Sequence, residues 1–228
     1  MAWVLGNLGL IRDLTLEHLW FALIPVVIGL VLAIPLGWLA NRTRLGRTLT
    51  INVAGLLYTI PSLALFVLLP PLLGTRILDP INVIVALTVY TVALLVRTVA
   101  DALSAVPPVV VNAATAMGYT PVRRFVGVEL PLSVPVVLAG LRVAAVSSIS
   151  LVTVGAVIGF GGLGRMFTDG FQRDIPQEIL TGIVLVLLMA LVVDGLILLI
   201  GRALTPWDRV GAGRSGRAAG RSRGRGPR

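Results

Sequence analysis

The sequence predicts an all-α, polytopic membrane protein with about five transmembrane helices. Hydrophobic residues occupy 57% of its 228 positions and charged residues only 13%, whereas a soluble domain carries about 25% charged residues. Several apolar runs also reach the roughly 20 residues that a helix needs to cross the hydrocarbon core of a bilayer. Composition and run length together therefore indicate a membrane protein, because too few polar side chains remain to coat a water-soluble globule.

The chain begins with a charged segment, residues 1–18, that precedes the first apolar run. Arg12 and Glu17 lie there among leucines, a pattern typical of a short amphipathic helix on the membrane surface. We expect this segment to be extracytoplasmic and its histidine, His18, to be an interfacial residue. The first span is predicted over residues 19–40, where internal prolines are tolerated because neighbouring helices satisfy the freed carbonyls.

The second span, residues 50–73, contains a proline that predicts an interruption near its middle. A helix break at membrane depth is tolerated only where it is buried in protein or lines a cavity. Both an aqueous path and the relief of packing at a helix crossing fit this pattern, so both stay open. The third span is predicted over residues 81–99. Polar or kinked positions of two spans are the candidate pathway-lining residues: Thr59, Pro61, Ser62, Ser147 and Ser150.

The fourth span, residues 134–160, is rich in small residues, which let helix backbones approach closely in lipid and place this span at the centre of the bundle. The fifth span covers residues 179–201. Arg142 and Asp194 are ionisable residues within these spans, and a polar contact inside the bundle is favoured over a proton relay. The Arg-rich tail, residues 202–228, cannot bury a core and is predicted to be disordered.

Residues 102–130, between the third and fourth spans, predict a pair of short helices rather than a span. Gly118 suits the left-handed position that ends a helix, while Thr120 and Pro121 suit the N-cap and first position of the next helix. Leu130–Pro131 is expected to end that second helix. Apolar residues exposed on such a loop indicate a protein partner or, as an open alternative, a helix that lies on lipid.

The distribution of arginines predicts the orientation of the chain in the membrane. One side collects the loop after the first span, residues 102–130 and the tail, with Arg42, Arg44, Arg47, Arg97, Arg123 and Arg124 before the tail begins. The other side has fewer arginines, each with acidic residues nearby: Arg12, Arg76, Arg165 and Arg173. Because basic residues mark cytoplasmic loops, the C-terminus is predicted to be cytoplasmic and the N-terminus outside.

The stretch from Asn112 to Pro135 resembles the signature loop of binding-protein-dependent ABC importer permeases. The residues at the family's spacing are Ala113, Ala114, Gly118, Leu130, Pro131 and Pro135, followed by Gly140 and Arg142. Asn112 departs from the pattern, because the family usually has a glutamate there. The resemblance implies a cytoplasmic coupling helix that docks on an ATP-binding subunit, with the implied coupling residues Asn112, Ala113, Ala114, Met117, Gly118, Tyr119, Pro121, Arg123 and Phe125.

Two further stretches, residues 59–64 and 158–164, resemble the osmoprotectant branch of that family, which imports glycine betaine, choline, carnitine or related quaternary amines. Methionine and sulfonate permeases share parts of both stretches, so those solutes remain alternatives. The resemblance implies a non-catalytic pore subunit, without cofactor or metal, in the plasma membrane of a bacterium. Its implied partners are a cytoplasmic ATP-binding subunit, an extracytoplasmic substrate-binding protein, a second permease copy or homologue, and membrane lipid, with no nucleic acid.

Several other classes of function lack the residues that they require. The chain has no cysteine and one histidine, which excludes thiolate chemistry and Cys-ligated metal sites. No Walker-type sequence occurs, so ATP hydrolysis must come from another subunit. An ion-coupled secondary transporter would show inverted repeats and clustered buried ionisable residues, and an intramembrane enzyme would need a catalytic His–Glu or Asp pair. Neither pattern is visible in the sequence.

Overall fold

The computed structural model describes residues 2–206, and all regular structure in this part of the chain is helical. The helices are α1 (Ala2–Gly6), α2 (Leu8–Ala40), α3 (Arg44–Thr59), α4 (Ser62–Leu73), α5 (Pro80–Ser104), α6 (Pro108–Ala116), α7 (Pro121–Arg124), α8 (Leu130–Gly155), α9 (Arg165–Gln172) and α10 (Pro176–Leu204). A π-helical turn, Phe125–Glu129, precedes α8, and a 3-10 turn, Ala156–Ile158, follows it. The predicted start of the disordered tail at residue 202 is wrong, because α10 continues to Leu204; residues 207–228 of that tail lie outside the described residues.

Within residues 2–206, four helical segments are long and apolar enough to cross a membrane: α2, α5, the segment Pro121–Ile158 that contains α7 and α8, and α10. The helices α3 and α4 meet at an angle of 99°, and the pair makes a fifth crossing if it is counted as one broken span. This geometry confirms the all-α polytopic fold. It also confirms the predicted interruption at Pro61, whose extended backbone ends α3 and begins α4.

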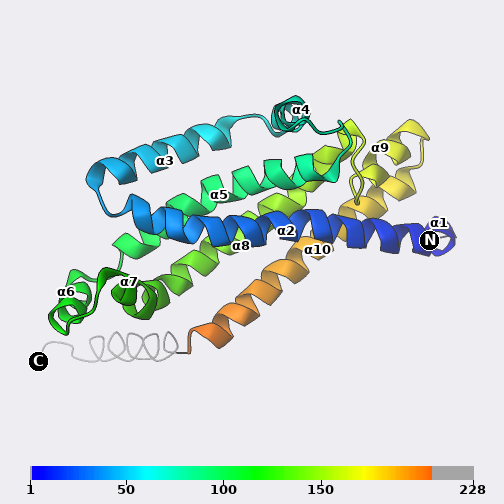
Figure 1. Cartoon of the computed structure of the whole chain (residues 1–228). Coiled ribbons are helices and arrows are strands. Elements are labelled where there is room, and N and C mark those ends of the chain that lie inside the picture. The colour runs from blue at the N-terminus through cyan, green and yellow to red at the C-terminus, as the bar shows by residue number, and fades with distance from the viewer. Residues whose placement is uncertain (1, 207–228) are drawn as a thin grey trace, which may run out of the picture.

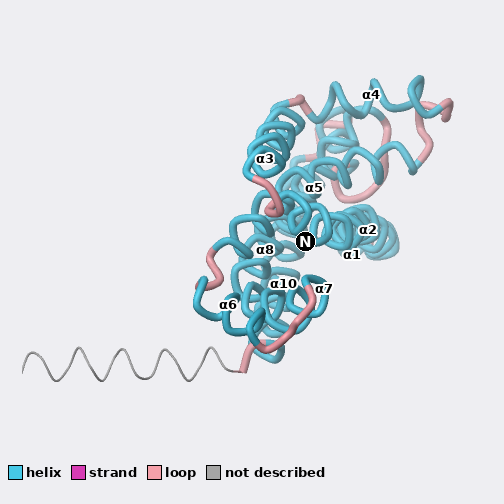
Figure 2. The backbone as a smooth tube through the Cα atoms, turned by 60° about the vertical axis from the view of Figure 1, so that its left-hand side comes forward, coloured by secondary structure: helices cyan, strands magenta, loops and turns pink. Residues whose placement is uncertain are grey.

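The long helices form an elongated bundle, and the shorter helices and turns lie toward its two ends (Figure 1). The turn between α2 and α3, the short helices α6 and α7, and the last turn of α10 lie at one end, while α1, α4 and α9 lie at the other. We call residues 107–129 the elbow, and we name the two ends the elbow end and the far end. Figure 2 shows α3 and α4 standing to one side of the bundle, with α5 between them and α2 and α8.

Helix α2 packs on α5 along a seam of small residues, Gly29, Ala33 and Gly37, spaced four positions apart. A Cβ atom added at Gly29 would lie 2.7 Å from the Cβ of Thr91, and one added at Gly37 would lie 2.9 Å from the Cβ of Val99. The two backbones therefore touch directly, the arrangement by which small residues stabilise helix pairs in lipid. The sequence analysis assigned such packing to the fourth span, and α8 does contact α2, α5 and α10.

The predicted surface helix before the first span is wrong, because α2 runs without interruption from Leu8 to Ala40. Leu14, His18 and Ala22 are all buried and lie four positions apart, so they extend the buried stripe of the span by two turns toward the N-terminus. Of the charged residues that led to the prediction, Arg12 is exposed, whereas Glu17 is half-buried. His18 is accordingly not an interfacial residue but a fully buried one.

Two neighbouring side chains of α2 hold the glycine-rich loop that follows α8. The Nδ1 atom of His18 accepts a hydrogen bond from the Leu163 N–H at 3.1 Å, and its Nε2 atom donates to the Ile149 carbonyl oxygen at 3.0 Å. The Glu17 carboxylate accepts from the Gly162 N–H at 3.0 Å. Gly162 has a φ of +78°, a conformation that glycine adopts without strain. His18 thus joins three segments of the far end.

Replacing His18 by leucine should destabilise the protein by about 1–3 kcal/mol, because the substitution leaves a buried N–H without an acceptor. Thermal unfolding of the purified protein in detergent measures this change. Leu16→Ala is the matched control, since Leu16 lies on the same helix but is exposed. Equal melting temperatures for both variants would contradict a structural role for His18.

Candidate functional site

The elbow begins with α6, which ends as the sequence predicts. The Gly118 N–H donates to the Thr115 carbonyl at 3.0 Å and the Tyr119 N–H to the Ala114 carbonyl at 3.1 Å. Gly118 itself has a φ of +83°. This pair of hydrogen bonds with a left-handed glycine is a Schellman motif, which satisfies the last free carbonyls of a helix. The turn therefore has one defined conformation.

The second helix of the elbow continues into the fourth span without a break. Thr120 has extended backbone and Pro121 opens α7, as predicted. The expected end at Leu130–Pro131 is wrong, because the helical segment runs from Pro121 to Ile158. The π-helical turn just before Leu130 explains the difference: its wider hydrogen-bond spacing makes room for a ring that lacks an N–H. The second arm of the elbow and α8 are consequently one continuous helical segment.

Phe125 fastens the elbow to the bundle. Its side chain is buried and stacks on Trp38 of α2, with ring centroids 4.8 Å apart and planes inclined by 27°. The guanidinium of Arg42 lies 4.1 Å from the centroid of the same tryptophan ring, a favourable cation–π geometry. A movement of the elbow must therefore move the end of α2 as well.

An ion pair stiffens the elbow internally. The Nε atom of Arg124 donates to the Glu129 carboxylate at 2.5 Å, and another guanidinium nitrogen of Arg124 donates to the Thr115 hydroxyl at 2.9 Å. Arg124 thus joins α6 to the π-helical turn across the Gly118 bend. The two arms of the elbow are held at a fixed angle by this side chain.

The predicted coupling residues divide into an exposed and a buried group. The exposed group is Asn112, Ala113, Met117, Gly118, Tyr119, Pro121 and Arg123, while Ala114 and Phe125 are buried. The elbow also exposes large apolar side chains at Val109 (72% exposed), Val122 (58%) and Val126 (57%), beside Met117 (71%). The sequence analysis did not single out Val122 and Val126, although their spacing of four residues could have indicated one helix face.

The break between α3 and α4 is held by a tyrosine of α5. The hydroxyl of Tyr90 donates a hydrogen bond to the carbonyl of Ile60, the residue at which α3 ends. The ring of Tyr90 also meets that of Tyr58 edge to face, with centroids 5.9 Å apart and planes at 87°. Neither tyrosine was predicted from the sequence to have a role. Both are spaced as ordinary span residues, so only the fold brings them together.

The candidate pathway residues lie around this break or on the facing stretch of α8. Thr59 and Pro61 are exposed, Ser62 is half-buried, and the Thr59 hydroxyl donates to the Leu56 carbonyl. Ser147 lines a small cavity with Tyr58 and Tyr90, whereas Ser150, also on α8, is exposed and does not line that cavity. This cavity is lined by Tyr58, Leu87, Tyr90, Thr91, Leu94, Ala144, Ser147, Ser148 and Leu151.

Arg142 of α8 and Asp194 of α10 form a bidentate ion pair, with both nitrogen–oxygen distances at 2.7 Å. The predicted polar contact within the bundle is therefore confirmed. Each arginine nitrogen meets its own carboxylate oxygen, the geometry in which this pair of groups is strongest. The contact fixes α10 against α8 at a depth where an unpaired charge would be costly.

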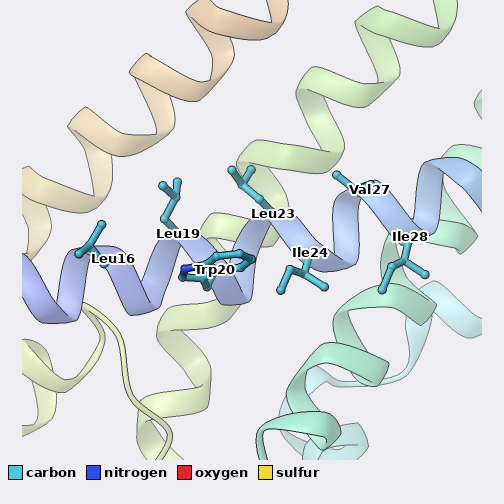
Figure 3. A pocket seen from close by; sticks show the side chains of 7 residues that line it. All are labelled: Leu16, Leu19, Trp20, Leu23, Ile24, Val27 and Ile28. Carbon is cyan, nitrogen blue, oxygen red and sulfur yellow. The ribbon is translucent and has the colours of Figure 1, made fainter.

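A groove of about 390 Å³ runs along the outer side of α2. All seven residues that line it come from this one helix and are apolar or aromatic: Leu16, Leu19, Trp20, Leu23, Ile24, Val27 and Ile28 (Figure 3). Such a lining offers no polar group except the Trp20 indole to orient a polar solute. Its chemistry suits hydrocarbon, and we do not place a solute site there.

With this geometry in hand, comparison with known proteins identifies the family. The family described as "Binding-protein-dependent transport system inner membrane component" matches residues 19–206. The chain belongs to this family. It is a multi-pass membrane protein and the permease subunit of an ABC importer.

Two relatives of this permease are transport permease subunits of similar length. Osmoprotectant import permease OsmW of Salmonella typhimurium is 35% identical over 90% of this chain and 96% of its own. Choline transport permease OpuBB of Bacillus subtilis is 34% identical over 84% of this chain and 87% of its own. Among solved structures, an inward-facing MetNI methionine ABC transporter superposes with a TM-score of 0.78 at 25% identity, covering 88% of this chain and 98% of that one.

Removing one partner of the ion pair should harm this permease more than removing both. Asp194→Asn leaves the Arg142 guanidinium unpaired in the bundle, whereas the double variant Asp194→Asn with Arg142→Gln leaves no charge behind. Fluorescence-detected size-exclusion chromatography of membrane extracts measures the folded yield. We expect the double variant to exceed Asp194→Asn in yield, and losses that simply add would contradict this coupling.

Proposed function

We propose that this permease imports quaternary-amine osmoprotectants such as glycine betaine or choline. The support is the set of relatives, whose names specify osmoprotectants, choline, and glycine betaine with carnitine and choline. The structural neighbour that transports methionine supports the shared fold but not the same solute. Methionine or sulfonate remains the second candidate, because its permeases share the same architecture. The chain itself performs no bond chemistry in this proposal.

ATP is hydrolysed by a separate cytoplasmic subunit that docks on the elbow. The observation that carries this assignment is the row of exposed apolar side chains at Val109, Met117, Val122 and Val126. Exposed apolar clusters outside the hydrocarbon core mark protein partners. In this proposal the elbow end is cytoplasmic, as the arginine distribution predicts, and the far end with α9 receives an extracytoplasmic substrate-binding protein.

The contacts of the elbow provide two routes by which a movement of the ATP-binding subunit is transmitted to the pore. One route is the continuous helix from Pro121 to Ile158, which carries the movement straight into α8. The other route is the stack of Phe125 on Trp38, which carries it into α2. Movement of packed helices as rigid bodies is a common form of such switching. Closure of the ATP-binding subunits would thus turn the pore from inward-facing to outward-facing.

The pore itself needs a second permease, either a copy of this chain or a homologue. One chain leaves the break between α3 and α4 exposed at Thr59 and Pro61, and free backbone groups at a break are stable only against protein or water. A second permease facing this side would enclose a water-filled path lined by the break. Lipid covers the outer groove of α2.

Asn112 is exposed at the position where the family usually has glutamate. The proposed docking surface therefore loses one negative charge but keeps its apolar residues. Docking then rests on apolar contact, with Arg123 as the exposed charged residue beside it.

Transport assays with defined components test the proposed function. The permease, its ATP-binding subunit and its binding protein are reconstituted in liposomes, and the binding protein is titrated with glycine betaine, choline and carnitine. We expect ATP-dependent uptake of at least one of these solutes. Uptake that proceeds without the ATP-binding subunit would indicate an ion-coupled transporter, and uptake of methionine alone would reassign the substrate.

Gly118→Ala should reduce the amount of solute imported per ATP hydrolysed. A Cβ at this position meets no other atom within 4 Å, so the change acts only through its positive φ of +83°, which costs an L-residue about 1–2 kcal/mol. Gly127→Ala is the matched control, because its Cβ would lie at an ordinary 3.7 Å from the Tyr119 ring. The ratio of uptake to phosphate release measures coupling. An unchanged ratio in Gly118→Ala would argue against the elbow as the docking element.

A further inference from the structure

We propose that the ring of Tyr58 is a transit contact for the quaternary ammonium group of the solute inside the pore. This inference rests on the proposed function, and it assigns one side chain of this permease to that solute class. Cationic trimethylammonium groups are attracted to the faces of aromatic rings. A transport path for such solutes therefore gains from an aromatic ring at a point where the cation has left bulk water.

The position of Tyr58 along the membrane fits this role. Tyr58 lies fourteen residues from Arg44, the first residue of α3, which corresponds to about 21 Å at 1.5 Å per residue. Its partner Tyr90 also lies fourteen residues from the elbow end of α5, at Ser104. Both helices thus place the tyrosine pair roughly two-thirds of the way through a hydrocarbon core of about 30 Å. The helix break beside this pair is not expected to face lipid, because free backbone groups at membrane depth require protein or water around them.

The exposure of the two rings separates their roles. Tyr90 is buried (5% exposed), gives its hydroxyl proton to the Ile60 carbonyl, and holds Tyr58 by its ring. Tyr58 is 46% exposed, so part of its ring remains available to a solute. The cavity behind it measures only about 10 Å³, which is too small for a trimethylammonium group. The solute must therefore meet the open side of the Tyr58 ring, and Tyr90 is a positioning residue.

The surroundings of Tyr58 suit weak and transient contact with a cation. None of the residues that line the cavity behind the ring carries a charge, so no carboxylate on that side competes with the ring for the cation; besides the two tyrosines, its polar residues are Thr91, Ser147 and Ser148. A carboxylate at this depth would hold the cation tightly and slow its release, whereas a ring attracts it without fixing it. Ser147, which was named as a candidate pathway residue from the sequence, lines the cavity behind Tyr58 and not the open side of its ring.

The test compares uptake by Tyr58→Phe, Tyr58→Leu and a series of fluorinated phenylalanines at position 58 in the reconstituted transporter. Fluorine withdraws electron density from the ring with little change in shape, so only a cation–π contact responds step by step. We expect Tyr58→Phe to keep the uptake rate of choline and Tyr58→Leu to lower it roughly two- to thirtyfold. Successive fluorination should lower it progressively, with binding-protein-stimulated ATP hydrolysis unchanged.

Leu56→Ala is the control, because Leu56 lies two positions away on α3 and is 69% exposed. Equal choline uptake by Tyr58→Leu and Leu56→Ala would overturn the inference while the proposed function stands. Loss of the assembled transporter in Tyr58→Leu on size-exclusion chromatography would also overturn it, since the ring would then be a packing contact with the second permease. Absence of quaternary-amine uptake by the unmodified transporter would remove the proposed function and this inference together.

Discussion

The direct packing of α2 on α5 is the constraint on which the other features of this permease depend. At Gly29 and Gly37 there is no room for a Cβ atom between the helices, so their relative register is fixed. A slip of one residue would rotate the side chains of α2 by about 100°. It would then remove Trp38 from Phe125 at the elbow and His18 from its partners at the far end. The same register lets α5 present Tyr90 to the break.

Helix α2 connects the two ends of the bundle through these contacts. His18 and Trp38 are twenty residues apart on one helix, which is about 30 Å. Each binds a segment that belongs to the other half of the chain: the loop after α8 in one case and the elbow in the other. A packed helix with anchored ends is a physical path for coupling between distant sites. The break at Pro61 lies beside this path and need not take part in the transmission.

The sequence predicted the features that depend on local chemistry. Hydropathy located the spans, Pro61 located the break, and Gly118 with Pro121 located the elbow turn, because each depends on a run of neighbours or on one backbone preference. Contacts between distant segments could not be predicted in this way. The charges near His18 suggested a surface, whereas its burial depends on the loop after α8 folding over it. The π-helical turn before Pro131 was missed for a related reason, since proline usually ends a helix.

In the elbow, the side chains that maintain the fold differ from those that form the exposed surface. Phe125 and Arg124 make contacts within the protein that hold the conformation of the elbow. Met117, Val122 and Val126 are exposed and form the surface available to a partner. Substitutions of these exposed residues therefore leave the packing of the bundle unchanged. In the proposed assembly, permeases that keep these exposed residues would present the same docking surface to an ATP-binding subunit, whatever residues line their pores. Under that proposal, a change of transported solute requires changes in the pore but none in the docking surface.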